Sequence, residues 1–182
     1  MKYEVIDNFL DKEYFDSLAT FFINQMPWFF SKEIAEENVV EDKLFYMYHN
    51  IYEDCVPKSV VFDKLFPLLG KLQDKDKHIH LLRIKANLYP SSETLQEHPM
   101  HTDFDYSHLT ALLSLNTCDG YTKLKDGTKI NSVANRVLLF DASEEHCSTT
   151  TTNNFARFNI NINYLTQRFL MKGYNDNQQN KK

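Results

Sequence analysis

The second half of the chain divides into short strand-like pieces, and this pattern limits the fold more than any other feature of the sequence. The run "IHLLRIKANLYP" (residues 79–90) is apolar and rich in residues that favour strands. Turn signals such as "CDGY" and "KDGTK" separate pieces further along the chain. Short strands at this spacing indicate an antiparallel sandwich or barrel. The later pieces are 100–106, 109–116, 120–124, 128–133, 136–140, 146–149 and 157–165.

The first part of the chain has helical periodicity instead. "YEVIDNFL" indicates a short strand and a turn, and residues 11–26 then carry apolar side chains at helical spacing, with Asp11 as the expected N-cap. Residues 59–75 indicate a second helix with Pro67 as a local interruption. Residues 27–58 are mixed and aromatic and show no clear pattern.

These patterns predict one mainly β domain of the α+β class. The chain has 182 residues, 42% of them hydrophobic, which suffices for one core but not for two comfortable domains. We expect helical N-terminal support over 1–78, a β core over 79–165 and a polar C-terminal tail over 166–182.

Charge and cysteine content restrict the partners and the location. The net charge of -5 counts mildly against a nucleic-acid partner, because the overall field repels a polyanion. Three cysteines without finger-like spacing favour a reducing compartment. The chain starts without a signal-peptide pattern, and no run approaches the roughly 20 apolar residues of a membrane span. We therefore expect a soluble cytoplasmic protein that does not enter a membrane. The sequence does not indicate the oligomeric state.

Two histidines and one aspartate form the candidate metal site. His101 and Asp103 are two residues apart, so on a strand they would share a face, and His146 follows a later apolar strand. Two imidazoles and one carboxylate form the facial triad that suits non-haem Fe(II) and leaves coordination positions open. The pair alone favours a structural or surface role, so the distal histidine is what favours a metal.

Arg157 begins the apolar strand "RFNININYL". A guanidinium stays charged and is costly to bury alone, and no anionic partner is obvious nearby in the sequence. A bound dicarboxylate is therefore a candidate partner, and a salt bridge to an aspartate from another strand is the alternative. Tyr89, which ends the strand "KANLYP", is placed to aim its hydroxyl at the same region or simply to pack.

In this order, these residues resemble the 2-oxoglutarate- and Fe(II)-dependent oxygenase superfamily, and most of all its prolyl-hydroxylase-like branch. "LYP" precedes the His-x-Asp motif and "TALLSLN" follows it, and "DGYTKL", "ANRVLLF", the distal histidine and "ARFNININYL" come next in the order of that branch. The likeness covers roughly residues 80–165, and "VIDNFLDKEYFDSLA" is similar to the usual N-terminal opening. It implies a double-stranded β-helix, also called a jelly roll.

The resemblance also implies roles for single residues. His101, Asp103 and His146 would bind Fe(II), and Arg157 would bind the C5 carboxylate of 2-oxoglutarate. The further co-substrate contacts it suggests are Tyr89, Ser114 and Asn159. Ser114 stands where some members have an aromatic residue, and Asp119-Gly120 stands where the branch often has two glycines.

The implied reaction is hydroxylation of an unactivated C–H bond with Fe(II), 2-oxoglutarate and O2, giving succinate and CO2 as co-products. The substrate would be a peptidyl side chain, prolyl-like, or a small metabolite. "RFN" together with Asn87 and Tyr89 is also similar to the nucleic-acid demethylase branch, which remains an alternative. A non-catalytic jelly-roll binding module is the second alternative.

Overall fold

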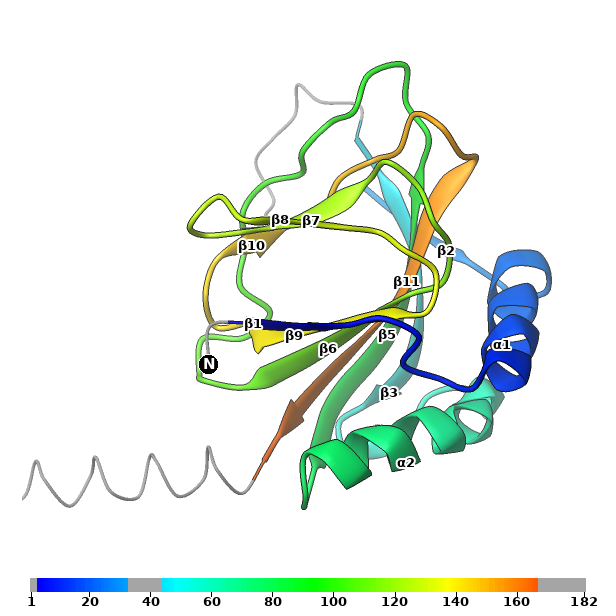
Figure 1. Ribbon diagram of the computed structural model, residues 1–182, viewed down its shortest axis with the longest axis vertical. Coiled ribbons are helices and arrows are strands. Elements are labelled where there is room, and N and C mark those ends of the chain that lie inside the picture. Colours follow the sequence, from blue (N-terminus) through cyan, green and yellow to red (C-terminus); the bar gives the residue numbers. More distant parts are fainter. Residues whose placement is uncertain (1–2, 33–43, 167–182) are drawn as a thin grey trace, which may run out of the picture.

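Two antiparallel sheets face each other, and two helices cover the outer side of the larger one (Figure 1). The computed structural model describes residues 3–32 and 44–166. This arrangement is a jelly roll, so the predicted fold class is confirmed. The tail predicted for 166–182 lies outside the described residues except for Thr166.

The larger sheet has eight strands. Their order across the sheet is β1 (Tyr3–Ile6), β9 (Arg136–Asp141), β6 (Leu109–Ser114), β11 (Ala156–Leu165), β5 (His80–Pro90), β3 (Tyr46–Glu53) and β2 (Phe29–Ser31), and β4 (Val56–Pro57) pairs with β3. The smaller sheet has the order β10 (His146–Cys147), β7 (Tyr121–Leu124) and β8 (Lys129–Asn131).

The division expected near residue 78 does not separate a helical part from a β part. Four strands precede that position, and they pair within the large sheet: β3 lies along β5, and β1 pairs with β9 on the far side. The segment that forms β2 and β3 showed no pattern because aromatic side chains occur on both faces of these strands. A two-residue alternation of apolar and polar residues was therefore absent.

The helices follow the predicted positions more closely. The first, α1 (Lys12–Asn24), starts after Asp11 and buries Phe15, Leu18 and Phe22. The second region is a 3-10 helix, η1 (Val60–Leu65), which continues into α2 (Phe66–Lys75). Pro67 lies in the first turn of α2 and does not interrupt a helix, since the first turn needs no backbone N–H there.

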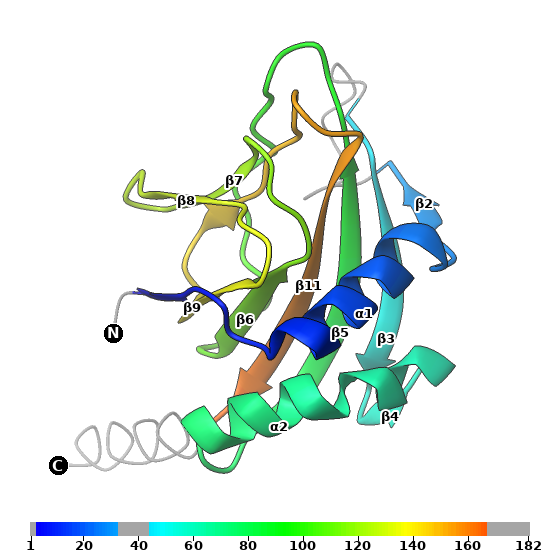
Figure 2. The same ribbon diagram turned by 45° about the vertical axis from the view of Figure 1, so that its right-hand side comes forward.

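The two faces of the large sheet differ in chemistry. On β11, Phe158, Ile160 and Ile162 belong to the main core, which includes buried residues of both helices. Figure 2 shows α1 and α2 against this face. The intervening residues of β11 are polar and face the small sheet: they are Arg157, Asn159, Asn161 and Asn163. We call the side of the large sheet that carries them the inner face; it holds the candidate site.

In the described part of the chain, no helix combines the length and hydrophobicity that a membrane span requires. Cys55, Cys118 and Cys147 are all free thiols.

Candidate metal and anion site

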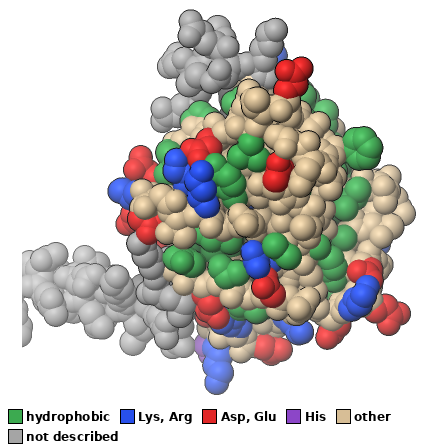
Figure 3. All heavy atoms as spheres, turned by 45° about the horizontal axis from the view of Figure 1, so that its top comes forward, with side chains coloured by type: hydrophobic (Ala, Val, Ile, Leu, Met, Phe, Trp, Pro, Cys, Tyr) green, Lys and Arg blue, Asp and Glu red, His purple; other side chains and the backbone are tan. Residues whose placement is uncertain are grey.

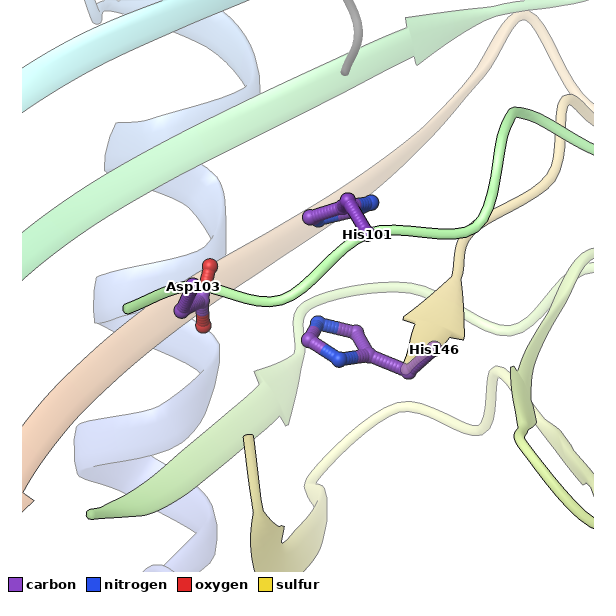
Figure 4. A group of neighbouring side chains, drawn as sticks. All are labelled: His101, Asp103 and His146. Carbon is purple, nitrogen blue, oxygen red and sulfur yellow. The ribbon is translucent and has the colours of Figure 1, made fainter. Parts of the chain in front are cut away.

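His101, Asp103 and His146 come together as the sequence predicted. One ligand atom from each side chain can be chosen so that all three lie within 4.8 Å of one another. His101 and Asp103 lie on the connection between β5 and β6, and His146 lies on β10 of the small sheet (Figure 4). A metal ion bound here would therefore join the two sheets.

A local backbone contact holds the two histidines together. His101 and His146 donate their N–H groups to each other's carbonyl oxygens, both at 2.9 Å, and their rings lie 4.7 Å apart. The strand predicted for 100–106 is wrong beyond this single bridge. The segment 100–106 pairs only with the turn and strand around His146, and Asp103 donates its N–H to Ala142.

The hydrogen bonds of both rings select the nitrogen that is open to a metal. Nδ1 of His146 lies 3.0 Å from the carbonyl oxygen of Glu144, and Nδ1 of His101 lies 3.3 Å from that of Pro99. Because a carbonyl oxygen only accepts, each Nδ1 carries the hydrogen, so in the neutral form of each ring the lone pair is on Nε2. Burial lowers the pKa of His146 more than the charge of Asp103 raises it, which favours the neutral, metal-binding form.

Asp103 is ionised although its side chain is only 6% exposed. Burial opposes ionisation, but the neighbouring His146 and Arg83, together with the amides of Asn163 and Asn161, lower its pKa to about 2. Arg83 donates to one carboxylate oxygen at 2.9 Å, and Asn163 donates to the other at 2.8 Å. A carboxylate held in this way is a fixed anionic ligand at any ordinary pH.

Arg157 is buried on the inner face, with 1% exposure and no anionic partner among the described residues. Its guanidinium donates to the carbonyl oxygen of Tyr121 at 2.9 Å and to Oγ1 of Thr122 at 2.8 Å, and Nε has no partner. The structural salt bridge considered for Arg157 is therefore absent from the described part of the chain. An uncompensated buried cation of this kind is suited to an anionic ligand.

The backbone at Gly120 makes room for this arginine. A Cβ atom at this position would lie 2.8 Å from Cδ of Arg157 and 2.7 Å from the carbonyl oxygen of Thr150. The second residue of the Asp119-Gly120 pair thus has a steric reason to be glycine. Asp119 accepts hydrogen bonds from Thr151 and Thr152 in the adjacent loop.

Tyr89 lies next to Arg157, and His98 packs against Tyr89. The Tyr89 ring is 5.7 Å from the Arg157 guanidinium and 5.0 Å from the His98 ring. Burial raises the pKa of Tyr89 to about 12, so its hydroxyl stays protonated. His98 is 3% exposed and its Nε2 has no partner, while Nδ1 lies 2.8 Å from Oγ of Ser148.

The two remaining predicted contacts are also on the inner face. Asn159 is buried and accepts a hydrogen bond from Asn87 at 3.0 Å, which brings together the Arg-x-Asn and Asn-x-Tyr motifs. Ser114 is buried on β6 directly opposite Asn159. Their contact with a co-substrate remains a prediction.

Several residues of the site were missed from the sequence. Asn161 and Asn163 share the two-residue alternation of Arg157, and Arg83 shares that of Tyr89, so the period could have revealed them. For His98 there was no such signal, and only the fold shows that the loop carrying it folds inward.

Many solved 2-oxoglutarate- and Fe(II)-dependent oxygenases share the fold of this chain. A viral collagen prolyl hydroxylase from Paramecium Bursaria Chlorella virus-1, solved with 2-oxoglutarate, matches with a TM-score of 0.60 and 14% identity over 90% of this chain and 95% of that one. A Trichoplax adhaerens prolyl hydroxylase, bound to a hypoxia inducible factor peptide fragment, matches with a TM-score of 0.64 and 18% identity over 91% and 84%.

HygX from Streptomyces hygroscopicus, solved with nickel and 2-oxoglutarate, has a TM-score of 0.59 and 12% identity, covering 91% of this chain and 83% of that one. No family model and no curated protein matches the sequence. At these identities the likeness establishes the shared fold, and the activity has to be argued from the site itself.

Proposed function

We propose that the protein is an Fe(II)- and 2-oxoglutarate-dependent dioxygenase that hydroxylates an unactivated C–H bond. The observation that carries this proposal is that the triad contacts the polar inner face through Asp103, and the same face carries Arg157, a buried cation with no anionic partner among the described residues. The fold shared with solved oxygenases, several of them complexes with 2-oxoglutarate, supports the same reading.

The donor set fits Fe(II): two neutral imidazoles and one carboxylate leave positions open for co-substrate and O2. Iron bound there would supply the O2 activation that couples hydroxylation to the conversion of 2-oxoglutarate into succinate and CO2. The protein's own part is to hold and orient. His101, Asp103 and His146 bind the metal, and Arg157 binds the distal carboxylate of 2-oxoglutarate.

Tyr89, Asn159 and Ser114 complete the proposed co-substrate contacts. The Tyr89 hydroxyl, protonated because its pKa is about 12, can donate to the carboxylate that Arg157 holds. Asn159, fixed by Asn87, and Ser114 line the path from Arg157 toward the metal ligands.

The proposed substrate is a peptidyl side chain, prolyl-like, or a small metabolite. Among the structures with this fold, two are named prolyl hydroxylases bound to a peptide fragment or to 2-oxoglutarate, and another is the epimerase SnoN, which was solved with nogalamycin RO. The fold therefore accommodates both classes, and the loops around the inner face must choose between them.

The alternatives have less support. A nucleic-acid demethylase would need a broad basic surface, and on the one face that Figure 3 shows, Lys and Arg side chains lie next to Asp and Glu. A non-catalytic binding module would have no need for a buried arginine without an anion beside a three-residue metal site.

We also propose that 1–182 forms one functional domain, since strands from the first 78 residues complete the sheet that carries the site. A reducing location such as the cytoplasm is supported by the three free thiols.

An anaerobic titration tests the function. 2-Oxoglutarate is added to the Fe(II)-loaded protein while the visible charge-transfer band of the iron chelate is recorded. The wild type should develop the band, and His101→Ala should not. Arg157→Met, which keeps the side-chain volume but removes the charge, should need at least about tenfold more 2-oxoglutarate.

His80→Ala is the matched control, because His80 is an exposed histidine on β5. Its titration should follow the wild type. Absence of the band in folded wild-type protein, judged by circular dichroism, would refute the dioxygenase proposal and favour the binding module.

A further inference from the structure

Lys85 is a cation on the inner face, and the function proposed above assigns it no role. It lies on β5 between Arg83 and Asn87, with the same two-residue alternation that directs Tyr89 inward. Its neighbour on β11 is Asn161, which donates a hydrogen bond to Asp103 at 3.2 Å. Lys85 is therefore next to the metal ligands rather than on the outer surface of the molecule.

The contacts of Lys85 are aromatic and neutral. Its Nζ donates to the Tyr46 hydroxyl at 3.0 Å and lies 5.3 Å from the centre of the Tyr46 ring and 5.1 Å from that of Tyr48. No carboxylate within the described residues lies within 4.0 Å of this ammonium group. An ammonium has three N–H donors, so it retains capacity for a ligand.

The nearby acids are already engaged. Asp103 forms its ion pair with Arg83 at 2.9 Å, and Glu53 accepts a hydrogen bond from Asn50. Burial, helped by the charge of Arg83, lowers the pKa of Lys85, whereas Asp103 and Glu53 act weakly in the opposite direction. An anion placed against Lys85 would relieve this electrostatic cost.

The charge of the loaded site leads to the same conclusion. Iron(II), Arg157, Arg83 and Lys85 carry the positive charge, and Asp103, Glu53 and the 2-oxoglutarate dianion carry the negative charge. One positive charge is then left over at the end of the face where Lys85 lies. A substrate with one anionic group would neutralise it.

Lys85 is too far from Arg157 to share its ligand group. The register of β11 and β5 places Arg157 opposite Tyr89 and Lys85 opposite Asn161, four residues further along the strands. At strand spacing, this separates their Cα atoms by roughly 13 Å. The two cations are thus placed for two different anionic groups.

We propose that Lys85, flanked by Tyr46 and Tyr48, binds a carboxylate of the primary substrate, so that the substrate is a carboxylic acid or an acidic peptide side chain. A carboxylate fits better than a phosphate because only one cation is free to bind it, Arg83 being paired with Asp103. This inference rests on the dioxygenase function proposed above and adds the substrate class.

The first measurement is binding at Lys85 itself. Protein loaded with Zn(II), which is diamagnetic and redox-inert, and saturated with 2-oxoglutarate is titrated with phenylacetate, propionate and inorganic phosphate. Phenylacetamide and propionamide serve as neutral counterparts. The Hε–Cε NMR signal of Lys85 is followed, assigned by its loss in Lys85→Met.

The apparent affinity obtained from this signal should be at least about tenfold higher for each carboxylate than for the amide with the same carbon skeleton. A signal that no carboxylate moves, or that the amides move equally, would overturn the inference. A shift by phosphate alone would replace the carboxylate class with a phosphate class.

The second measurement separates this inference from the proposed function. The anaerobic Fe(II) titration with 2-oxoglutarate is repeated on Lys85→Met, with the exposed-lysine variant Lys12→Met as control. Both should bind 2-oxoglutarate like the wild type. If Lys85→Met weakens 2-oxoglutarate as much as Arg157→Met does, Lys85 serves the co-substrate and the substrate inference fails. If the wild type forms no chelate, the dioxygenase function itself fails.

Discussion

Asp103 shows how single side chains prepare this site before any metal arrives. Its carboxylate accepts hydrogen bonds from Arg83, Asn161 and Asn163 in a position that is almost shielded from water. Partners of this kind fix the rotamer of a ligand and its charge at once. The energy of the metal site therefore depends on residues that never touch the metal.

We expect Asn163→Leu to weaken metal binding about tenfold, because the leucine has a similar volume but cannot donate to Asp103. Calorimetric titration of Zn(II) into the metal-free protein measures this. Asn131→Leu, at an exposed position of β8, is the control and should bind as the wild type does. Equal affinity in both variants would show that Asn163 does not position the carboxylate.

His98 gives the protein a pH-dependent stability. Burial first, then the charges of Arg157 and His101, lower its pKa to about 4 from the ordinary 6.5. At pH values between these two pKa values, His98 is therefore protonated in the unfolded chain but neutral in the folded protein. Stability should fall as the pH drops from about 6.5 toward 4, by at most about 3 kcal/mol from this residue.

Urea unfolding of the metal-free protein at pH 7 and pH 5 checks this expectation for the wild type and for His98→Gln. Glutamine does not titrate, so the loss of stability at pH 5 should be smaller in the variant. The same loss in both proteins would assign the pH dependence to other groups.

At this scale, the sequence predicted the residues whose type alone is informative. Two histidines, an aspartate and an arginine in a fixed order implied the triad and Arg157; in the structure the three triad side chains come together, and Arg157 is buried. Whether Arg157 has a salt-bridge partner could not be predicted, because the answer lies in which side chains the fold brings near. The same holds for His98, which reaches Tyr89 only through the course of its loop.

At the scale of elements, β11 serves both the core and the site. Its outward residues pack under the helices, and its inward residues reach the metal ligand and the proposed co-substrate. The alternation of polar and apolar residues in "RFNININYL" matches this division of faces. The missed strand β3 shows the limit, because Tyr46 and Tyr48 lie at Lys85 on the inner face whereas Tyr52 packs against the main core, so its tyrosines give no two-residue periodicity.

Ile160 is 0% exposed on the outer face of β11, so substitutions there test how much core packing contributes to the free energy of unfolding. We expect Ile160→Ala to lower the free energy of unfolding by about 3 kcal/mol, and Ile160→Val by about 1 kcal/mol, because each leaves a cavity under the helices. Urea denaturation measures both. A cost below about 1 kcal/mol for the alanine variant would mean that this face is not tightly packed.

The strand β7 must pass close to β11, and Gly120 permits this. In Gly120→Ala, the added methyl group would displace the Arg157 side chain or the Thr150 carbonyl, since both lie under 3.0 Å away. We expect the 2-oxoglutarate concentration needed to form the charge-transfer band of the Fe(II)-loaded protein to rise about tenfold, while the affinity for Zn(II) stays unchanged. Gly70→Ala, where the new methyl group would meet nothing within 4 Å, is the control. If both variants need the same 2-oxoglutarate concentration as the wild type, Gly120 has no steric role at Arg157.

At the scale of the whole molecule, the metal ligands come from parts that the chain connects only indirectly. His101 and Asp103 belong to the crossing between β5 and β6, whereas His146 belongs to the small sheet. Two backbone hydrogen bonds between His101 and His146 hold the connecting segment against the small sheet. A bound metal would add a second link across the same gap.

Metal binding should therefore stabilise the entire fold and not only the site. A ligand that binds only the folded state adds about 2.7 kcal/mol at a concentration one hundred times its dissociation constant. For a chain of this size, that corresponds to a rise in Tm of roughly 6–10 °C. Differential scanning calorimetry of the protein with and without Zn(II) measures it. His146→Ala removes the small sheet's ligand and should abolish the rise, whereas the exposed-site variant His80→Ala should retain it. If His146→Ala shows the full rise, the metal binds elsewhere and the two sheets are not joined through this site.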